Sequence, residues 1–284
     1  MKFLQTIFKS RLTVLVLFTL QIHPSFAGSA QYIFPGFSSL DKTSPTYAAN
    51  LKALILADLV RVEGGTFNMG SDLPSARKRE KPVHEVELDT FYIAKTELSQ
   101  QLFEHIMGWN YSYFACEFCA VNNLSWKNAQ SFILKLNTIT GLKLNFPSEA
   151  QWEFAAKGGN QSKGYTFSGS DNIDEVAWNA NNAQKRSRAV ASLKPNELGL
   201  YDMTGNLWEF VLDDMSRVAY QHSELKNPVY SITDDSSKTT MKVIRGGGYE
   251  FSAAESEVFK RDGATSNVRM PDIGFRLAMN DDAN

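Results

Sequence analysis

Cysteine is scarce in this chain, which has only two among its 284 residues. Both lie in one C-x-x-C segment, as Cys116 and Cys119. A structural zinc site needs a second pair of ligands at a suitable spacing, and the sequence has none. A thioredoxin-like redox pair would begin a helix after a strand, whereas this pair stands in a segment typical of a loop. We therefore predict a short local disulfide, as is usual in exported proteins.

Histidine is also rare, and the sequences that mark common active sites are missing. The chain has four histidines. It has no H-E-x-x-H motif, no G-x-S-x-G turn and no phosphate loop ending in Gly-Lys-Ser or Gly-Lys-Thr. Asp213 and Asp214 are adjacent acids, and such pairs usually are solvated or cap a turn. The residues thus indicate no familiar arrangement for nucleophilic or zinc-dependent catalysis.

An excess of positive charge is absent as well. The formal net charge is −2, and without the three basic residues of the first 27 it becomes −5, from 26 basic and 31 acidic residues. The longest basic cluster, Arg77-Lys78-Arg79, is followed at once by Glu80 and is typical of a solvated loop. We expect no nucleic-acid partner and no general attraction to anionic membranes.

Residues 1–27 have the composition of a secretory signal peptide. Basic residues precede a mostly apolar run over residues 12–22, and a small-x-small cleavage site ends at Ala27. The run is shorter than the roughly 20 residues that a membrane-spanning helix needs. We expect this leader to be cleaved, so that the protein is periplasmic or extracellular and has no integral membrane segment after cleavage.

Residues 28–58 are expected to form an arm that precedes the main domain. Its first part contains Pro35 and Gly36 and indicates a loop, whereas residues 47–59 are apolar enough for one helix. Short strands are predicted on both sides of Gly64-Gly65 and over residues 84–88, where polar and apolar side chains alternate.

Three helices can be placed because each combines a serine cap, an apolar stripe and a terminal glycine. They are expected over residues 99–108, 125–141 and 148–158. In the third, Ser148 and Gln151 have the spacing of a capping box. Trp126 and Trp152 lie on the apolar stripes and are therefore predicted to be core residues rather than part of a cofactor site.

Four motifs follow one another in the rest of the chain. They are NFPSEAQWEFAAKGG at 145–159, GLYDMTGNLWEF at 199–210, IRGGGY at 244–249 and IGFR at 273–276. Together and in this order they resemble the formylglycine-generating enzyme, or sulfatase-modifying factor, family. The resemblance implies a single compact α+β domain over residues 59–280, irregular, low in regular secondary structure and distantly similar to C-type lectins. The many Asn, Gly and Ser residues after Gly159 agree with such a fold, because turns and side chains then satisfy the backbone.

The resemblance also implies a structural calcium ion. Family members bind one through the positions that match Asp202, Gly205, Leu207 and Glu209, with main-chain oxygens from the second and third. Two of the four are carboxylates here, and calcium prefers such hard oxygen ligands. The alternative is that the two carboxylates cap turns or pair with Arg245 or Arg276. Arg245, Arg261 and Arg276 match arginines that recur in the family, and we expect them to organise the irregular loops.

In the oxidising members of the family, two cysteines after the RGG turn bind the copper that activates oxygen. Alignment on the turn places Phe251 and Ser256 at these positions. Phenylalanine cannot ligate a soft cuprous ion, and serine is a poor substitute for a thiolate. Cys116 and Cys119 belong to a different motif far upstream. Copper binding and formylglycine generation are therefore not expected of this chain.

Two functions remain open from the sequence. The favoured hypothesis is an exported, non-oxidising member that presents a binding surface to a protein, a peptide or a glycan. The candidate binding residues are Tyr249, Glu250, Phe251, Ser256 and Phe259, since aromatic side chains around a pocket supply large contact areas. A plainer interpretation is that Phe251 only fills the volume of lost copper ligands. The alternative function is an enzyme, oxidoreductase-like or linked to sulfur or pigment metabolism, that uses other chemistry in the same cleft.

Overall fold

The computed structural model describes residue 37 and residues 40–232 and 240–281. The predicted signal peptide, residues 1–27, lies outside the described residues, and so does the first part of the predicted arm. All described residues fall within one unit of the chain, Gln31–Asn284. None of the helices in these residues combines the length and the apolar composition that a membrane crossing requires.

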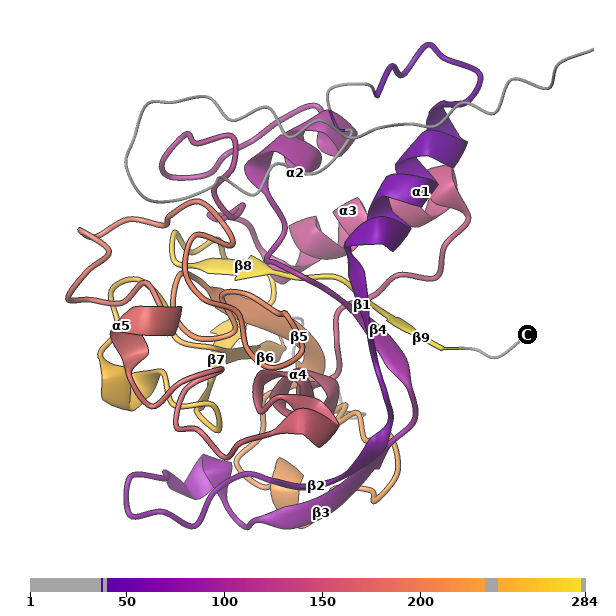
Figure 1. Ribbon diagram of the computed structural model, residues 1–284. Helices are drawn as coiled ribbons and strands as arrows, with labels where there is room; N and C mark the ends of the chain where they lie inside the picture. Colours follow the sequence, from indigo (N-terminus) through magenta and orange to yellow (C-terminus); the bar gives the residue numbers. More distant parts are fainter. Residues whose placement is uncertain (1–36, 38–39, 233–239, 282–284) are drawn as a thin grey trace, which may run out of the picture. The chain divides into compact units, whose positions relative to one another are not determined.

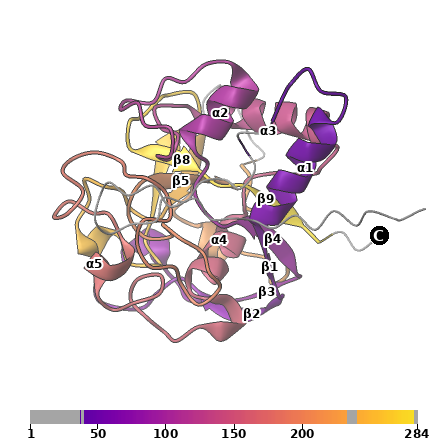
Figure 2. The ribbon, with the colours of Figure 1, turned by 45° about the horizontal axis from the view of Figure 1, so that its top comes forward.

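Three helices pack together around one part of the core (Figure 1 and Figure 2). They are α1 (Tyr47–Asp58), α2 (Gln100–Met107) and α3 (Trp126–Thr140). The side chains of Ser99 and Ser125 accept hydrogen bonds from the first turns of α2 and α3, and left-handed Gly108 and Gly141 end these helices. These contacts confirm the predicted caps. Each cap pairs backbone groups that a helix leaves without a partner at its ends.

Helix α1, predicted as part of an arm that precedes the domain, packs in the domain core. Leu51 and Ile55 of α1 are buried in the same hydrophobic cluster as the apolar faces of α2 and α3. The helix predicted at residues 47–59 is therefore present, but it is part of the domain core. The expected boundary at residue 59 divides this core, because the sequence pattern of α1 did not show which neighbour would cover it.

Helix α4 (Glu149–Ala156) packs in a second hydrophobic cluster. Ser148 and Gln151 form the predicted capping box, in which each side chain accepts from the other residue's backbone N–H. Trp152 is fully buried, as expected. The helix contacts strands from two different sheets, which makes it the element that joins them.

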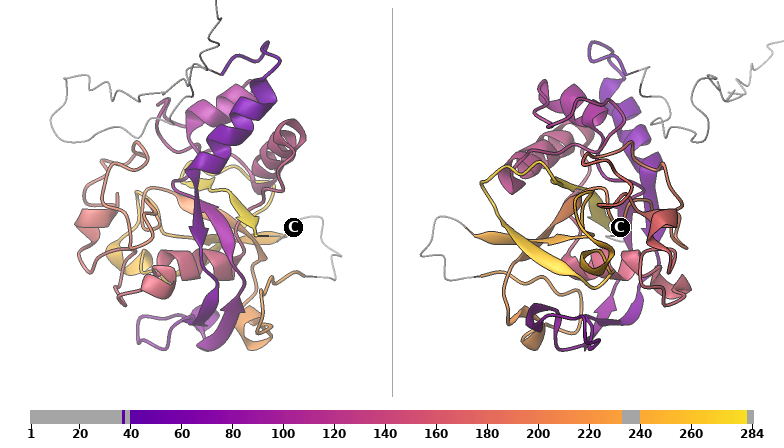
Figure 3. Two further views of the ribbon diagram at one scale, coloured as in Figure 1. Left: turned by 45° about the vertical axis from the view of Figure 1, so that its right-hand side comes forward. Right: turned by 90° about the vertical axis from the view of Figure 1, so that its left-hand side faces the viewer.

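The strands of the described residues form three small sheets (Figure 3). One has the order β1-β4-β9, from β1 (Leu59–Val62), β4 (Phe91–Ala94) and β9 (Ala278–Asn280). The second is the antiparallel pair β2 (Gly65–Met69) and β3 (His84–Leu88). The third has the order β7-β6-β5-β8, from β5 (Trp208–Asp214), β6 (Met241–Arg245), β7 (Arg261–Thr265) and β8 (Ile273–Phe275), with β5 and β8 parallel.

Regular structure is sparse between α4 and β5. Residues 162–207, all of them described, contain one four-residue helix, α5 (Ile173–Val176), and no strand. Short 3-10 turns complete the regular elements, at η2 (Lys78–Glu80), η3 (Gly159–Gln161), η4 (Ala219–Gln221) and η5 (Ala253–Glu255). The fold is thus the compact, irregular α+β arrangement predicted from the sequence, with loops held by side chains.

Arg245, at the end of β6, is the clearest example of such a side chain. It is completely buried, and its guanidinium binds the Glu153 carboxylate of α4. It also donates to the main-chain oxygens of Phe259, at 3.0 Å, and Val258, at 3.1 Å. One guanidinium therefore connects the four-stranded sheet, α4 and the segment before β7.

Two further arginines repeat this arrangement. Arg261 of β7 forms a two-bond pair with Glu149, with both N···O distances at 2.6 Å. Arg276, after β8, forms a two-bond pair with Glu209 of β5, with both distances at 2.7 Å, and donates to the main-chain oxygen of Tyr201 at 2.8 Å. All four of these ionic side chains are buried. The organising role expected for the three arginines follows from these contacts.

We predict that Arg245→Met destabilises the domain by about 3–5 kcal/mol, because Glu153 loses a buried partner and two carbonyl groups lose a donor. Urea unfolding at neutral pH measures the change. The matched control is Arg77→Met, since Arg77 makes only half-exposed ion pairs with Glu255 and Asp262. It should cost less than about 1 kcal/mol. Equal losses in the two variants would contradict the organising role of Arg245.

Candidate functional site

The turn after β6 is built around glycine. Gly246 and Gly247 have φ values of +99° and +78°, a region that favours glycine over residues with a side chain. A Cβ atom on Gly247 would collide with the side chain of Ser256. Ser256 is buried, and its hydroxyl donates to the main-chain oxygen of Ser252 at 3.1 Å. The turn is therefore closely packed, with Ser256 directly against it.

Phe251 lies against the same turn. Its ring is half-buried and meets the ring of Trp208 edge to face, with 5.3 Å between centroids. A Cβ atom on Gly248 would be 3.4 Å from the Phe251 ring. The structure thus brings Phe251 and Ser256 to one glycine turn. An aromatic ring and a hydroxyl do not form a donor set for a cuprous ion.

The two cysteines lie in a different segment of the chain from the glycine turn. Cys116 and Cys119 are joined by a disulfide. The Cys119 sulfur lies 3.9 Å from the main-chain oxygen of Ser187, and the Cys116 N–H donates to the Gln100 side chain at 3.1 Å. Bonded to each other, the sulfurs are not thiolates, so they offer no replacement for copper ligands at the turn.

The five candidate binding residues do not form one exposed surface. Tyr249 and Phe259 are only 2% and 5% exposed, and Ser256 is buried. Glu250 is exposed and Phe251 is half-buried. The expectation that Tyr249 and Phe259 offer aromatic contact area is therefore corrected. Both side chains are buried, and Tyr249 packs in a cluster with Ala120 and Leu207.

An exposed aromatic surface does lie in this region, on residues that sequence analysis did not select. Tyr111 and Tyr113 are 53% and 66% exposed. The Arg269 guanidinium lies over the Tyr111 ring at 4.7 Å and over the Trp109 ring at 6.0 Å. Val268 and Met270 are exposed beside Arg269 in the sequence. We call Trp109, Tyr111, Tyr113, Val268, Arg269 and Met270 the aromatic patch.

Two loops that are distant in sequence are joined at the aromatic patch. Asn123 donates from its side chain to the main-chain oxygen of Tyr111, at 2.6 Å, and from its N–H to that of Met270, at 3.0 Å. Burial raises the pKa of Tyr249, which follows the glycine turn, to about 12, and the charges of Glu250, Asp272 and Tyr113 add to the shift. The sequence signal for this patch is the aromatic density of WNYSYF at residues 109–114.

The two carboxylates among the expected calcium ligands, Asp202 and Glu209, bind protein partners. Both oxygens of Glu209 bind Arg276, and one also accepts from the Trp152 indole at 2.9 Å. Asp202 accepts from the N–H of Ala191 at 2.7 Å. Among the described residues, no group of three or more His, Cys, Asp or Glu side chains could hold a metal ion. Calcium binding at Asp202, Gly205, Leu207 and Glu209 stays a prediction.

Asp213 and Asp214, expected to be solvated or to cap a turn, are both buried. Asp213 accepts from the N–H of Glu149 at 2.7 Å and from that of Tyr230 at 2.8 Å, so it holds the start of α4. Burial and the charge of Glu149 raise the pKa of Asp213 to about 7. Asp214 pairs with Lys242 at 2.7 Å. These acids therefore position the backbone and an amine, and are not an exposed pair.

We predict a pH-dependent stability that Asp213→Asn removes. In the unfolded chain Asp213 ionises near pH 3.8, but in the folded chain near pH 7. The folded state therefore holds an extra proton between these values, and its stability falls as pH rises, by at most about 1.4 kcal/mol per pH unit. Urea unfolding between about pH 5 and about pH 8 should show a steeper decline for the wild type than for the variant. Parallel curves would contradict the raised pKa.

One protein-family model matches most of the chain. Residues 46–281 match the model described as "Sulfatase-modifying factor enzyme 1-like domain". One similar curated protein is "Chaperone protein LppX" from Paenibacillus barcinonensis, 28% identical over 270 residues that cover 78% of this chain and 88% of that protein. The "Formylglycine-generating enzyme" of Streptomyces coelicolor is 28% identical over 174 residues, 56% of this chain and 52% of that enzyme.

Other similarities extend over a comparable part of the chain. "Inactive C-alpha-formylglycine-generating enzyme 2" from Bos taurus is 23% identical over 282 residues, 78% of this chain and 87% of that protein. "Treponema denticola variable protein 1" has a TM-score of 0.69 with 24% identity, and PvdO from Pseudomonas aeruginosa a TM-score of 0.67 with 21% identity. Each of these two structures covers 78% of this chain, which covers 94% of each. At such identities the structures show the shared fold alone.

Proposed function

The chain belongs to the family of the sulfatase-modifying factor enzyme 1-like domain, and we propose that it is an exported, non-oxidising member that binds protein segments or peptides at the aromatic patch. The observation that carries this proposal is the exposure of Tyr111 and Tyr113, with the Arg269 guanidinium over the Tyr111 ring. Tyrosine and arginine dominate the binding energy of many protein interfaces, because both combine large contact area with directed hydrogen bonds.

The loops that carry the aromatic patch support a binding role because side-chain contacts hold them in place. Asn123 binds both loops. The N–H of Tyr113 donates to the Asn122 side chain at 2.9 Å, and the disulfide closes the same segment three residues later. A surface that is ordered before binding loses less conformational entropy when a partner arrives. The glycine turn and the buried arginines behind it form the rigid support.

The relatives favour a polypeptide over a glycan as the partner at this surface. The name of the Paenibacillus relative describes a chaperone, a class of protein that acts on other polypeptides, and its similarity covers 78% of this chain. The name of the bovine relative describes an inactive member, which supports a role without oxidation. The leader composition of residues 1–27 supports export.

The prediction that the protein does not oxidise a substrate cysteine is tested by copper loading and a turnover assay. The purified protein, loaded with Cu(I) in air and mixed with a cysteine-containing sulfatase-type peptide, should form no aldehyde by mass spectrometry, because Phe251 and Ser256 offer no thiolate. The informative variant is the double substitution F251C and S256C, which should acquire Cu(I) in metal analysis if the two positions match the catalytic pair. Aldehyde formation by the wild type would refute the non-oxidising assignment.

The binding surface is tested with a displayed random peptide library and calorimetry of the selected peptides. Tyr113→Ala and Arg269→Ala should each weaken binding about tenfold or more, because each removes a central contact of the aromatic patch. The matched control is Leu134→Ala, an exposed residue of α3 that should leave affinity unchanged. Failure to select any peptide, or equal affinities for all variants, would argue against this surface.

A further inference from the structure

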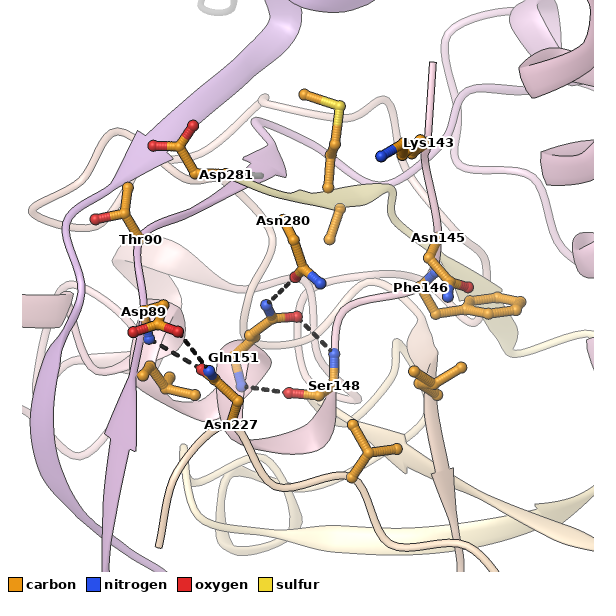
Figure 4. A pocket seen from close by; sticks show the side chains of 15 residues that line it. Asp89, Thr90, Lys143, Asn145, Phe146, Ser148, Gln151, Asn227, Asn280 and Asp281 are labelled. Carbon is orange, nitrogen blue, oxygen red and sulfur yellow. Dashed lines mark hydrogen bonds between the residues drawn. The ribbon is translucent and has the colours of Figure 1, made fainter. Parts of the chain in front are cut away.

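A cavity of about 490 Å³ lies at β9 and the start of α4, and shares no residue with the aromatic patch (Figure 4). Its walls come from the turn between β3 and β4, the segment before α4, the loop around Asn227, and β9. Its size is within the range of roughly 300–1,000 Å³ that is usual for small-molecule sites. Most of its lining side chains are polar, which limits the class of ligand.

Four of the lining residues are neutral amides, namely Asn145, Gln151, Asn227 and Asn280. Figure 4 shows Gln151 and Asn280 meeting in the middle of the view. The Asn280 oxygen accepts from the Gln151 amide at 2.9 Å, and the Gln151 oxygen accepts from the N–H of Ser148 at 2.9 Å. The capping box of α4 thereby sets the orientation of Asn280, whose amino group carries two further donors.

A second hydrogen-bonded pair, Asp89 and Asn227, also lines the cavity. Asn227 accepts from the N–H of Asp89 at 2.9 Å and donates to the Asp89 carboxylate at 2.7 Å. The Lys226 amine lies 2.9 Å from the other carboxylate oxygen. Hydrogen bonds from Lys226 and Asn227 lower the pKa of Asp89, so this group is an ionised acceptor at neutral pH. The cavity thus presents both oriented amide donors and an oriented carboxylate acceptor.

The remaining lining restricts the ligand further. The two lining carboxylates, Asp89 and Asp281, are each paired with a cation, Lys226 at 2.9 Å and Arg61 at 3.6 Å, so their charges are compensated and a neutral ligand is favoured. Leu212, Val229 and Met279 supply an aliphatic strip, and the one lining aromatic, Phe146, is buried. Amides both donate and accept, which matches hydroxyl groups, and the aliphatic strip matches C–H surface.

From this lining we propose that the cavity binds a small neutral saccharide, a mono- or disaccharide. Ring hydroxyls donate to the Asp89 carboxylate and accept from the Asn280 amino group, while a C–H face of the sugar packs on Val229. The site is independent of the peptide surface, because the cavity and the aromatic patch lie on different loops and share no residue. The chain then has two binding sites with different ligand classes.

The experiment measures ligand binding to the full domain by two methods. Saturation-transfer NMR and calorimetry are run with glucose, galactose, mannose, N-acetylglucosamine and their common disaccharides, and with glycylglycine as a competing neutral ligand. At least one sugar should bind to the wild type. Asn280→Leu should weaken it about tenfold, the cost of losing one or two hydrogen bonds. Val229→Trp should abolish binding by filling the cavity.

Matched controls separate this site from the aromatic patch. Leu134→Trp, an exposed aliphatic-to-indole change on α3, should keep full sugar affinity, and so should Tyr113→Ala, which weakens only peptide binding. Melting temperatures establish that each variant is folded. The proposal is overturned if no sugar binds, if Val229→Trp still binds, or if glycylglycine binds more tightly than every sugar. Loss of sugar binding in Val229→Trp with peptide binding intact supports two independent sites.

Discussion

The pairing of buried guanidinium groups with carboxylates is the constraint on which this irregular domain depends. Arg245, Arg261 and Arg276 each bind a glutamate of α4 or β5, and each also donates to main-chain oxygens of neighbouring segments. Long stretches of the chain have no ladder of backbone hydrogen bonds, so side chains must supply the partners. A planar group with five donors can satisfy several segments at once, which a hydrophobic contact cannot do.

The network of buried arginine–carboxylate pairs also explains the position of the glycine turn after β6. Arg245 fixes the end of β6 on α4, and the chain can then reverse tightly through Gly246 and Gly247 against Ser256 and Trp152. Side chains that follow the turn are placed on a rigid base. A family with such a base can change its function by changing a few residues around the turn, because the support is stable without them. The half-buried ring of Phe251 on Trp208 is compatible with both packing and ligand contact.

Much of the local structure could be predicted from residues that act on their immediate neighbours. The serine caps of α2, α3 and α4, the left-handed glycines at 108 and 141, and the strand at 84–88 all depend on interactions within a few residues. The exposed fraction of a side chain could not be predicted from its neighbours in the sequence. Tyr249 and Tyr113 have the same side chain, yet one is 2% and the other 66% exposed. The difference arises because Tyr249 packs on Ala120 and Leu207, which approach it only in the folded chain.

By itself the sequence determined the family, the α+β class, the helix caps, the presence of the arginines and the lack of thiols after the glycine turn, since motifs and caps are properties of short stretches of chain. Only the tertiary structure decided that Glu209 pairs with Arg276, that α1 belongs to the core, and that Tyr111 and Tyr113 remain exposed beside Arg269. It also assembled the cavity around Asn280 from five separate segments. Such groupings depend on contacts between residues far apart in the sequence, 67 positions for Glu209 and Arg276 and 129 for Gln151 and Asn280, for which a linear pattern carries no local signal.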